Sequence, residues 1–174
     1  LSQGLPTWNP NLPKGWLLNA GGLLAAAEHA LKNGSITGNL GHGYHHASVG
    51  RGMGYCTINA LAVVALRLVK EGKAKKVMIV DLDQHEGNGS GDILLGEPGI
   101  FNITIHGSGM LGPAAWRNHR VLRVDHGAFW LNPRKRDVNY LAVIASVLPG
   151  LIQQENPDLI LYQAGMDPFD GAGI

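Results

Sequence analysis

Carboxylate and imidazole side chains follow two apolar segments of this 174-residue chain. Asp81, Asp83 and His85 come directly after residues 77–80, and Asp167 follows a second apolar run. Alternate residues of an extended segment share one face, so Asp83 and His85 could bind one ion, with Asp167 as a third ligand. Two carboxylates and one imidazole suit Zn²⁺ or Fe²⁺, and three protein ligands leave coordination positions open for water and substrate.

Two adjacent histidines form the second group of residues that could take part in a chemical reaction. His45 and His46 follow the segment Gly41-His42-Gly43, where glycine lets the backbone pass close to a ligand. Unperturbed imidazole titrates near ~6.5, so the pair fits proton transfer at neutral pH. Two loop histidines without a catalytic role are the alternative for the pair by itself. A lone Asp-x-His is likewise often a turn, but the longer Asp-x-Asp-x-His run after an apolar strand favours a metal site.

Short apolar runs that alternate with helical patterns must position these residues. Residues 1–20, with three prolines, are expected to be irregular. Helices are expected at 23–33, 57–71 and 138–156, the last capped by Asp137 and bent by Pro149. Strands are expected at 35–40, 77–80, 101–106, 121–124 and 159–164. This order predicts an α/β fold of three layers, a mainly parallel sheet with helices on both faces, whose polar strand ends meet at one edge.

Composition excludes several classes of protein. With 14 Lys and Arg against 13 Asp and Glu, the net charge is +1, which gives no electrostatic argument for nucleic acid or an anionic membrane. One cysteine, Cys56, excludes a disulfide framework and a cysteine-rich zinc module. No run reaches the ~18 apolar residues of a membrane helix, and the first residues lack the basic region of a secretory signal. We therefore expect one cytoplasmic domain over residues 1–174.

Four motifs occur in the order found in one known family: GHGYHHA at 41–47, GMGYCTIN at 52–59, DLDQHEGNG at 81–89 and AGMDP at 164–168. The chain resembles the zinc-dependent histone deacetylases of the arginase/deacetylase superfamily over nearly its whole length. The Asn-Gly of the third motif and the Asp-Pro of the fourth are similar to bacterial and class IV-like members. The resemblance implies that Asp83, His85 and Asp167 hold the catalytic zinc.

The resemblance also implies roles for the residues around the metal. His46 would be the general base and acid, and His45 its electrostatic partner. Asp81 would orient His45, and Asn88, where many members have Asp, would orient His46.

Two further sites are implied by the same resemblance. Tyr55, where Phe is common, would line the tunnel for the acyl-lysine side chain together with Gly54. The family's structural K⁺ or Na⁺ site would correspond to the backbone oxygens of Asp81, Asp83 and His85 with the Thr104 hydroxyl.

The implied reaction is hydrolysis of the amide bond of N-acyl-lysine or of an acylated small amine. Family members stabilise the oxyanion with a tyrosine from a glycine-rich loop beyond the last metal ligand, and this sequence has no counterpart. Loss of such a donor costs ~10²–10³ in rate. We therefore expect a partial or reduced member, which also lacks the family's N-terminal strand region. Glu86 stands where His or Gln is more usual and could alter the metal preference, and Ala60 replaces a frequent Asp.

The sequence alone leaves two alternative functions open. A catalytically weak or inactive deacetylase-like module would keep the fold and the zinc. An arginase-type hydrolase with two manganese ions is disfavoured, because Gly87 stands where a second-metal Asp is typical. The basic segment 70–76 is expected to be a solvated connection between a helix and a strand. Aromatic residues exposed by missing parts of the fold would favour a homo-oligomer.

Overall fold

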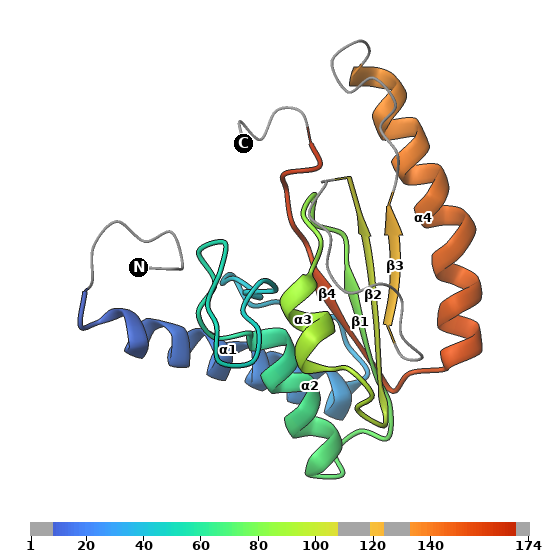
Figure 1. Ribbon diagram of the computed structural model, residues 1–174. Helices are drawn as coiled ribbons and strands as arrows, with labels where there is room; N and C mark the ends of the chain where they lie inside the picture. Colours follow the sequence, from blue (N-terminus) through green and yellow to red (C-terminus); the bar gives the residue numbers. More distant parts are fainter. Residues whose placement is uncertain (1–8, 108–118, 124–132, 170–174) are drawn as a thin grey trace.

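A parallel sheet forms the centre of the computed structural model, which describes residues 9–107, 119–123 and 133–169 (Figure 1). Its elements are, in chain order, α1 (Leu12–Asn33), α2 (Ala60–Lys70), β1 (Val77–Asp81), α3 (Asn88–Ile93), β2 (Ile100–His106), β3 (His119–Arg123), α4 (Pro133–Glu155) and β4 (Leu159–Gln163). The strand order is β3-β2-β1-β4, and each pair is parallel.

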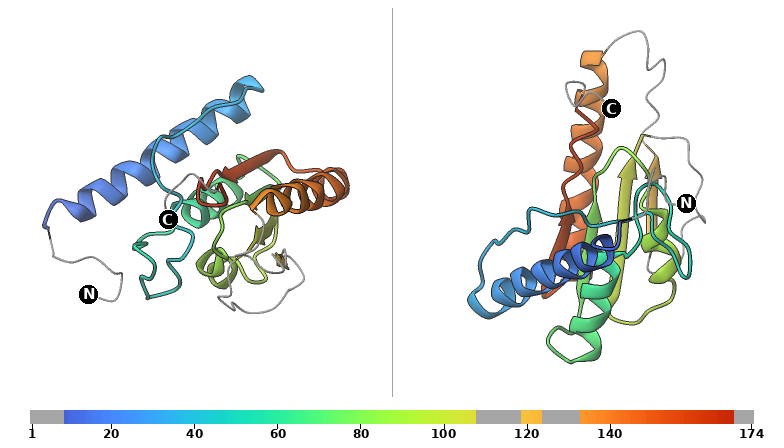
Figure 2. Two further views of the ribbon diagram at one scale, coloured as in Figure 1. Left: turned by 90° about the horizontal axis from the view of Figure 1, so that it is seen from above. Right: turned by 90° about the vertical axis from the view of Figure 1, so that its left-hand side faces the viewer.

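Helices cover both faces of this sheet, as Figure 2 shows from above and from the side. Successive strand side chains point to opposite faces, so Val77 and Ile79 of β1 pack with α1 and α2, whereas Met78 and Val80 pack with α4. Short α3 lies on the same face as α2. The predicted α/β class, with a parallel sheet between two helical layers, is confirmed.

Helix α1 begins at Leu12, so the expectation of an irregular arm is wrong for residues 12–20. Pro13 lies in the first turn, where its missing N–H costs no helical hydrogen bond. Trp16 is buried, and this packing stabilises a segment whose glycines and prolines favour irregular structure. The end of the helix is as expected, with Gly34 in the left-handed conformation at a φ of 59°.

The strand expected at residues 35–40 is not formed, because these residues have no regular structure and pair with no strand. Ile36 and Leu40 are fully exposed at 103% and 108%. The alternating pattern has no sheet neighbour among the described residues, and a strand is stable only when its hydrogen bonds are paired.

The starts of two further helices differ from the expectation by three residues or more. Helix α4 starts at Pro133, so Asp137 lies inside the helix and does not cap it, while Pro149 lies within it as expected. Helix α2 starts three residues later than expected, because the Asn59 side chain accepts a hydrogen bond from the Ala62 N–H at 3.0 Å and caps it there.

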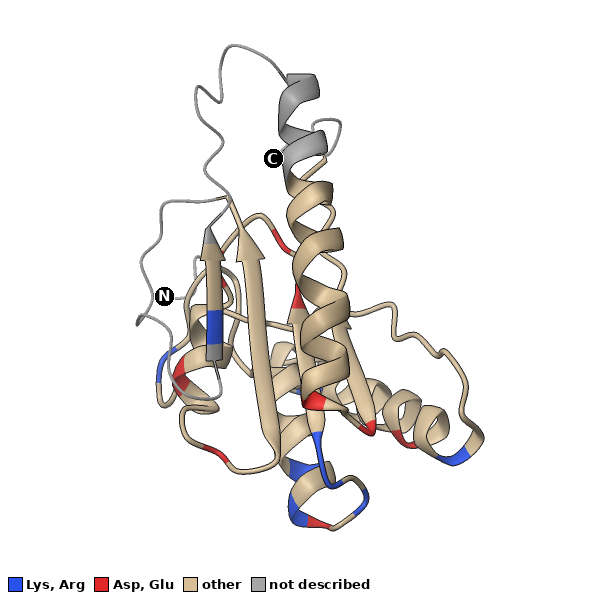
Figure 3. Cartoon of the chain, turned by 90° about the vertical axis from the view of Figure 1, so that its right-hand side faces the viewer, with Lys and Arg blue, Asp and Glu red and all other residues tan. Residues whose placement is uncertain are grey.

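Several charged groups at the surface form ion pairs. Lys and Arg gather around the end of α2 and the turn that follows (Figure 3). Lys73 contacts Glu28 and Glu71 at 2.6 Å, and Lys76 contacts Glu155 at 3.1 Å. The basic segment is therefore a solvated, ion-paired connection, as expected. Among the described residues, no helix has the length and apolar character needed to cross a membrane.

Candidate metal centre and active site

Three side chains that could hold a metal ion meet beyond the carboxyl ends of β1 and β4. One ligand atom from each of Asp83, His85 and Asp167 lies within 4.8 Å of the others. His85 Nδ1 lies 2.7 Å from Asp167 Oδ2 and 3.3 Å from Asp83 Oδ1. The two carboxylates are largely buried, while the His85 side chain is 47% exposed. This donor set fits one Zn²⁺ or Fe²⁺, with an open side toward solvent.

The strand register explains why residues 83 and 167 meet although they are far apart in the sequence. β1 and β4 are parallel neighbours, with Asp81 opposite Gln163, so the loops that follow them leave the same edge of the sheet. The Gln84 N–H donates to Asp167 Oδ1 at 3.0 Å and links the two loops directly. The parallel strands therefore bring Asp83 and Asp167 together at one edge of the sheet.

Residues 81–85, called the ligand loop below, are also held by hydrogen bonds to their own carboxylates. The Asp83 N–H donates to Asp81 Oδ1 at 3.1 Å, and the His85 N–H donates to Asp83 Oδ1 at 2.9 Å. Asp81 is fully buried, and both of its oxygens accept hydrogen bonds, which offsets the cost of burying the charge.

Two buried imidazoles lie beside this cluster, 4.0 Å apart between ring centroids. His45 Nδ1 donates to Asp81 Oδ2 at 2.7 Å, and His46 Nδ1 donates to Asn88 Oδ1 at 2.7 Å. The His46 ring lies 6.0 Å from the ring of His85, in an edge-on arrangement. The structure thus brings together the two histidines, their proposed partners and the ligand cluster.

The surroundings shift the pKa values of the two imidazoles in opposite directions. Burial lowers the pKa of His45, but the Asp81 carboxylate, helped by Asp83 and Asp167, raises this pKa by more, so the net shift is upward. Burial and the neighbouring His45 lower the pKa of His46, and the hydrogen bond with Asn88 offsets this only in part. The cationic form is therefore favoured at His45 and the neutral form at His46, which is typical of paired acid–base groups.

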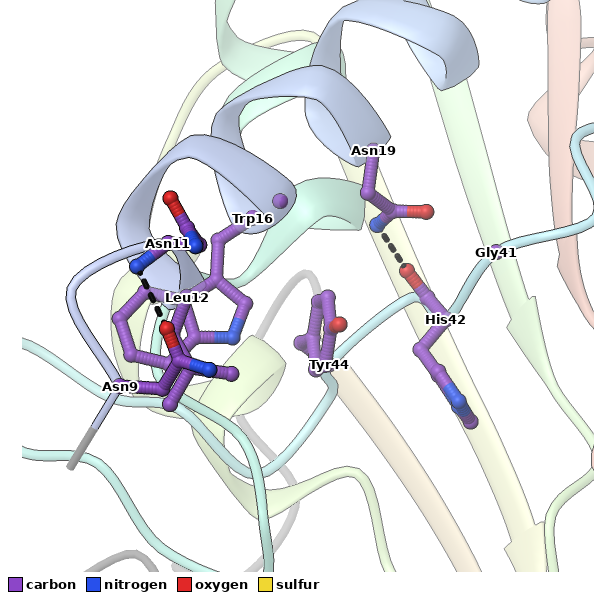
Figure 4. A pocket seen from close by; sticks show the side chains of 9 residues that line it. Asn9, Asn11, Leu12, Trp16, Asn19, Gly41, His42 and Tyr44 are labelled. Atoms are coloured by element: carbon purple, nitrogen blue, oxygen red, sulfur yellow. Dashed lines mark hydrogen bonds between the residues drawn. The ribbon is translucent and has the colours of Figure 1, made fainter. Parts of the chain in front are cut away.

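Helix α1 anchors the loop that carries these histidines. The Asn19 side chain donates to the His42 carbonyl at 2.6 Å, beside a pocket lined by Trp16 and Tyr44 (Figure 4). At Gly43, a Cβ atom would overlap the side chains of Leu61 and Gln163. A side chain at position 43 would therefore require Leu61 and Gln163 to move.

Gly89 of α3 lies against the backbone of the histidine loop. The neighbouring Ser90 N–H donates to the His45 carbonyl at 3.0 Å, and a Cβ on Gly89 would overlap the Ala47 carbonyl oxygen. We expect Gly89→Ala to lower the free energy of unfolding by about 1–3 kcal/mol, because backbone atoms must move. Denaturant unfolding measures this.

Gly150→Ala is the matched control for Gly89→Ala. Gly150 also lies in a helix, but a Cβ there would contact nothing within 4 Å. This variant is expected to be as stable as the parent or up to ~1 kcal/mol more stable. Equal effects of the two substitutions would contradict the close approach at Gly89.

The residues expected to line a substrate tunnel lie next to His46. A Cβ on Gly54, which has a φ of 53°, would overlap the His46 ring. Tyr55 adopts a φ of 63°, which is unusual for a side chain with Cβ, and is 69% exposed. Tyr55, the next residue along the chain, thus lies at the surface, and its role in a tunnel remains a prediction.

Thr104, expected at a monovalent cation site, lies opposite Asp81 in the β1–β2 register. Its hydroxyl accepts a hydrogen bond from the Gly87 N–H at 3.3 Å. The cation site itself remains a prediction.

Glu86 does not join the metal ligands, although it follows His85 directly. Its side chain is buried and lies 3.8 Å from the buried His106, between Oε2 and Nε2. His106 is thus a packed histidine at the end of β2.

Some residues at the site were missed by the sequence interpretation. Asn19 and Tyr140 hold the backbone of the two functional loops through contacts with residues 23 and 58 positions away. Helix α3, which supports the histidine loop, was also missed, because six residues with two glycines carry no helical pattern.

Comparisons with known proteins show the family to which the chain belongs. Residues 6–172 match the family model described as the histone deacetylase domain. The chain therefore belongs to the histone deacetylase domain family. An uncharacterized protein of Picosynechococcus sp. is 33% identical over 168 residues, which cover 97% of this chain and 53% of that protein. Human histone deacetylase 7 is 31% identical over 156 residues, which cover 83% of this chain and 16% of that protein.

Solved structures show the same fold. The HDA15 HD domain matches with a TM-score of 0.68 and 27% identity, covering 87% of this chain and 46% of that one. The acetylpolyamine aminohydrolase from Burkholderia pseudomallei matches with a TM-score of 0.69 over 88% of this chain, and at 21% identity it supports the fold alone. The chain spans about half the length of the Picosynechococcus relative and of these two structures.

Proposed function

We propose that this chain acts in the zinc-dependent hydrolysis of amide bonds in N-acyl-lysine or in an acylated small amine. The observation that carries the proposal is the position of the buried His46, whose pKa is lowered by burial and by His45, beside the cluster of Asp83, His85 and Asp167. A metal-ligand cluster and a separate proton acceptor are the two parts that hydrolysis of an unactivated amide requires.

The three ligands and the histidine pair have distinct tasks in this mechanism. When bound by Asp83, His85 and Asp167, Zn²⁺ supplies a Lewis acid for the substrate carbonyl and lowers the pKa of bound water. His46 uses Nδ1 to bond Asn88, so its Nε2 is the atom that accepts a proton from the attacking water. The same nitrogen then donates this proton to the leaving amine, and the products are a carboxylate and the free amine. Burial lowers the pKa of His45, but the Asp81 carboxylate that holds the ring raises this pKa by more, which favours the imidazolium form beside the developing negative charge.

Two substrate sources share this chemistry. Among the proteins similar to this chain are histone deacetylases and an acetylpolyamine aminohydrolase, as their names state. Acetyl-lysine peptide and an N-acetylated diamine, supplied to the zinc-loaded chain, separate the two by their kcat/KM values. Release of acetate from either substrate supports the proposal.

A metal-binding module without hydrolytic activity is the second candidate. It is consistent with the coverage of about half the length of the relatives, because residues outside the matched half can contribute to catalysis in those proteins. Zinc binding at one equivalent with no release of acetate would support this candidate over the enzyme.

The pH profile tests the role of His46. Burial and His45 lower the pKa of His46, so its neutral form persists below the ordinary imidazole value of 6.5. The acid limb of kcat/KM is therefore expected below pH 6.5. Asn88→Asp places a carboxylate on Nδ1, which favours the imidazolium and moves the acid limb to higher pH. Identical acid limbs in the two proteins would contradict the assignment.

A further inference from the structure

One hydrogen bond connects the far helical layer with the metal-ligand loop. The hydroxyl of Tyr140, on α4, donates to the Leu82 carbonyl at 2.6 Å. Leu82 lies between Asp81, which holds His45, and the ligand Asp83. The carbonyl belongs to the peptide group whose N–H, on Asp83, donates to Asp81 Oδ1. Both ends of this one peptide group are therefore fixed.

The Asp83 N–H and the Leu82 carbonyl have hydrogen-bond partners of different kinds. Three N–H groups of the ligand loop donate to carboxylate oxygens, on Asp81, Asp83 and Asp167. Two of these carboxylates belong to the ligand cluster itself, so the strength of their hydrogen bonds depends on what else they bind. The hydrogen bond from Tyr140 is accepted by a neutral carbonyl outside the ligand cluster. Its strength therefore does not depend on what the cluster carboxylates bind.

Packing holds the Tyr140 hydroxyl in place. Its side chain lies in the apolar layer between α4 and the sheet, with Leu82 and Ile144. Burial raises the pKa of Tyr140, and nearby Tyr162 and the site carboxylates raise it further, so the hydroxyl keeps its proton. A protonated donor on a packed helix gives a bond of fixed direction.

We propose that Tyr140 is a positioning residue of the metal centre, whose hydroxyl orients the peptide between Leu82 and Asp83 and so aims the Asp83 carboxylate at His85 and Asp167. This inference rests on the proposed metal-binding function. It connects the packing of α4 on the sheet with the affinity for the ion, through Tyr140, which lies 58 positions after Leu82.

Tyr140→Phe removes the hydroxyl and keeps the ring in the apolar layer. We expect the Kd for Zn²⁺, measured by competition with a chromophoric chelator, to rise about tenfold, as is typical when a partner that orients ligands is lost. The absorption spectrum of the Co²⁺-loaded variant is expected to change as well, because the ligand geometry relaxes. Incorporation of 4-aminophenylalanine at position 140 restores a donor and is expected to bring the Kd back toward the parent value.

Two controls separate positioning from general destabilisation. Tyr162→Phe removes a hydroxyl from a tyrosine that is 58% exposed on the neighbouring β4 and is expected to leave the Kd unchanged. Ile144→Val weakens the same apolar layer without touching the hydroxyl, and it should lower the melting temperature but not the affinity.

The outcomes distinguish this inference from the function on which it rests. A parent chain that binds no Zn²⁺ overturns the proposed function and the inference together. A parent chain that binds Zn²⁺, with an equal Kd in Tyr140→Phe, overturns the inference alone. An equal loss of affinity in Ile144→Val, or no recovery with 4-aminophenylalanine, also overturns it.

Discussion

Replacing His46 with alanine is expected to lower kcat/KM for hydrolysis of an acetyl-lysine peptide by ~10²–10⁴-fold, the usual contribution of general acid–base catalysis. The metal affinity should stay within about twofold of the parent value, because the His46 ring bonds Asn88 and is not part of the ligand cluster. Steady-state kinetics and a chelator competition on the same preparation measure both quantities.

His42→Ala is the matched control for this variant. His42 lies in the same loop, but its side chain is exposed, and the loop is held by its carbonyl. Its kcat/KM is expected to stay close to that of the parent. Full activity in His46→Ala would remove the general-base assignment, and loss of the metal in that variant would mean that His46 acts on the structure of the site.

Replacing Asp83 with alanine is expected to give the largest loss of metal. The substitution removes one of three ligands and also the acceptor of the His85 N–H, so a second ligand loses its anchor. The affinity for Zn²⁺ should therefore fall by more than the ~10–100-fold typical of residues that only orient ligands. Elemental analysis after dialysis, together with the chelator competition, measures this.

Asp92→Asn provides the control for a general effect of charge. Asp92 is an exposed carboxylate on α3, and its Oδ2 accepts from the Val49 N–H. The amide oxygen of Asn can keep that bond, so the metal content should not change. If Asp83→Ala retained one equivalent of zinc, the ligand set would be wrong.

The sheet and the ligand cluster could be predicted because their signals are local. The strand at residues 77–80 is a continuous apolar run that ends at Asp81, and parallel strands place their carboxyl ends at one edge. This rule predicts that Asp83 and Asp167 lie at the same edge, and the pairing of β1 with β4 in the structure brings them close together.

Other parts depend on partners far away in the sequence. Residues 35–40 have the composition of a strand, but no neighbouring strand pairs with them among the described residues. The first turns of α1 contain Pro13 and Gly15, and only burial of Trp16 against the rest of the fold favours the helix there. The hydrogen bond from Tyr140 to Leu82 likewise depends on how α4 packs on the sheet, and no local sequence pattern predicts this packing.

Titration of the metal-free chain with Zn²⁺, with hydrolysis of an acetyl-lysine peptide followed at each step, tests the central claim most directly. The account predicts no hydrolysis before zinc is added, and a linear rise that ends at one equivalent, because one cluster of three ligands holds one ion. Full occupancy at one equivalent without hydrolysis, or hydrolysis that does not depend on the metal, would contradict it.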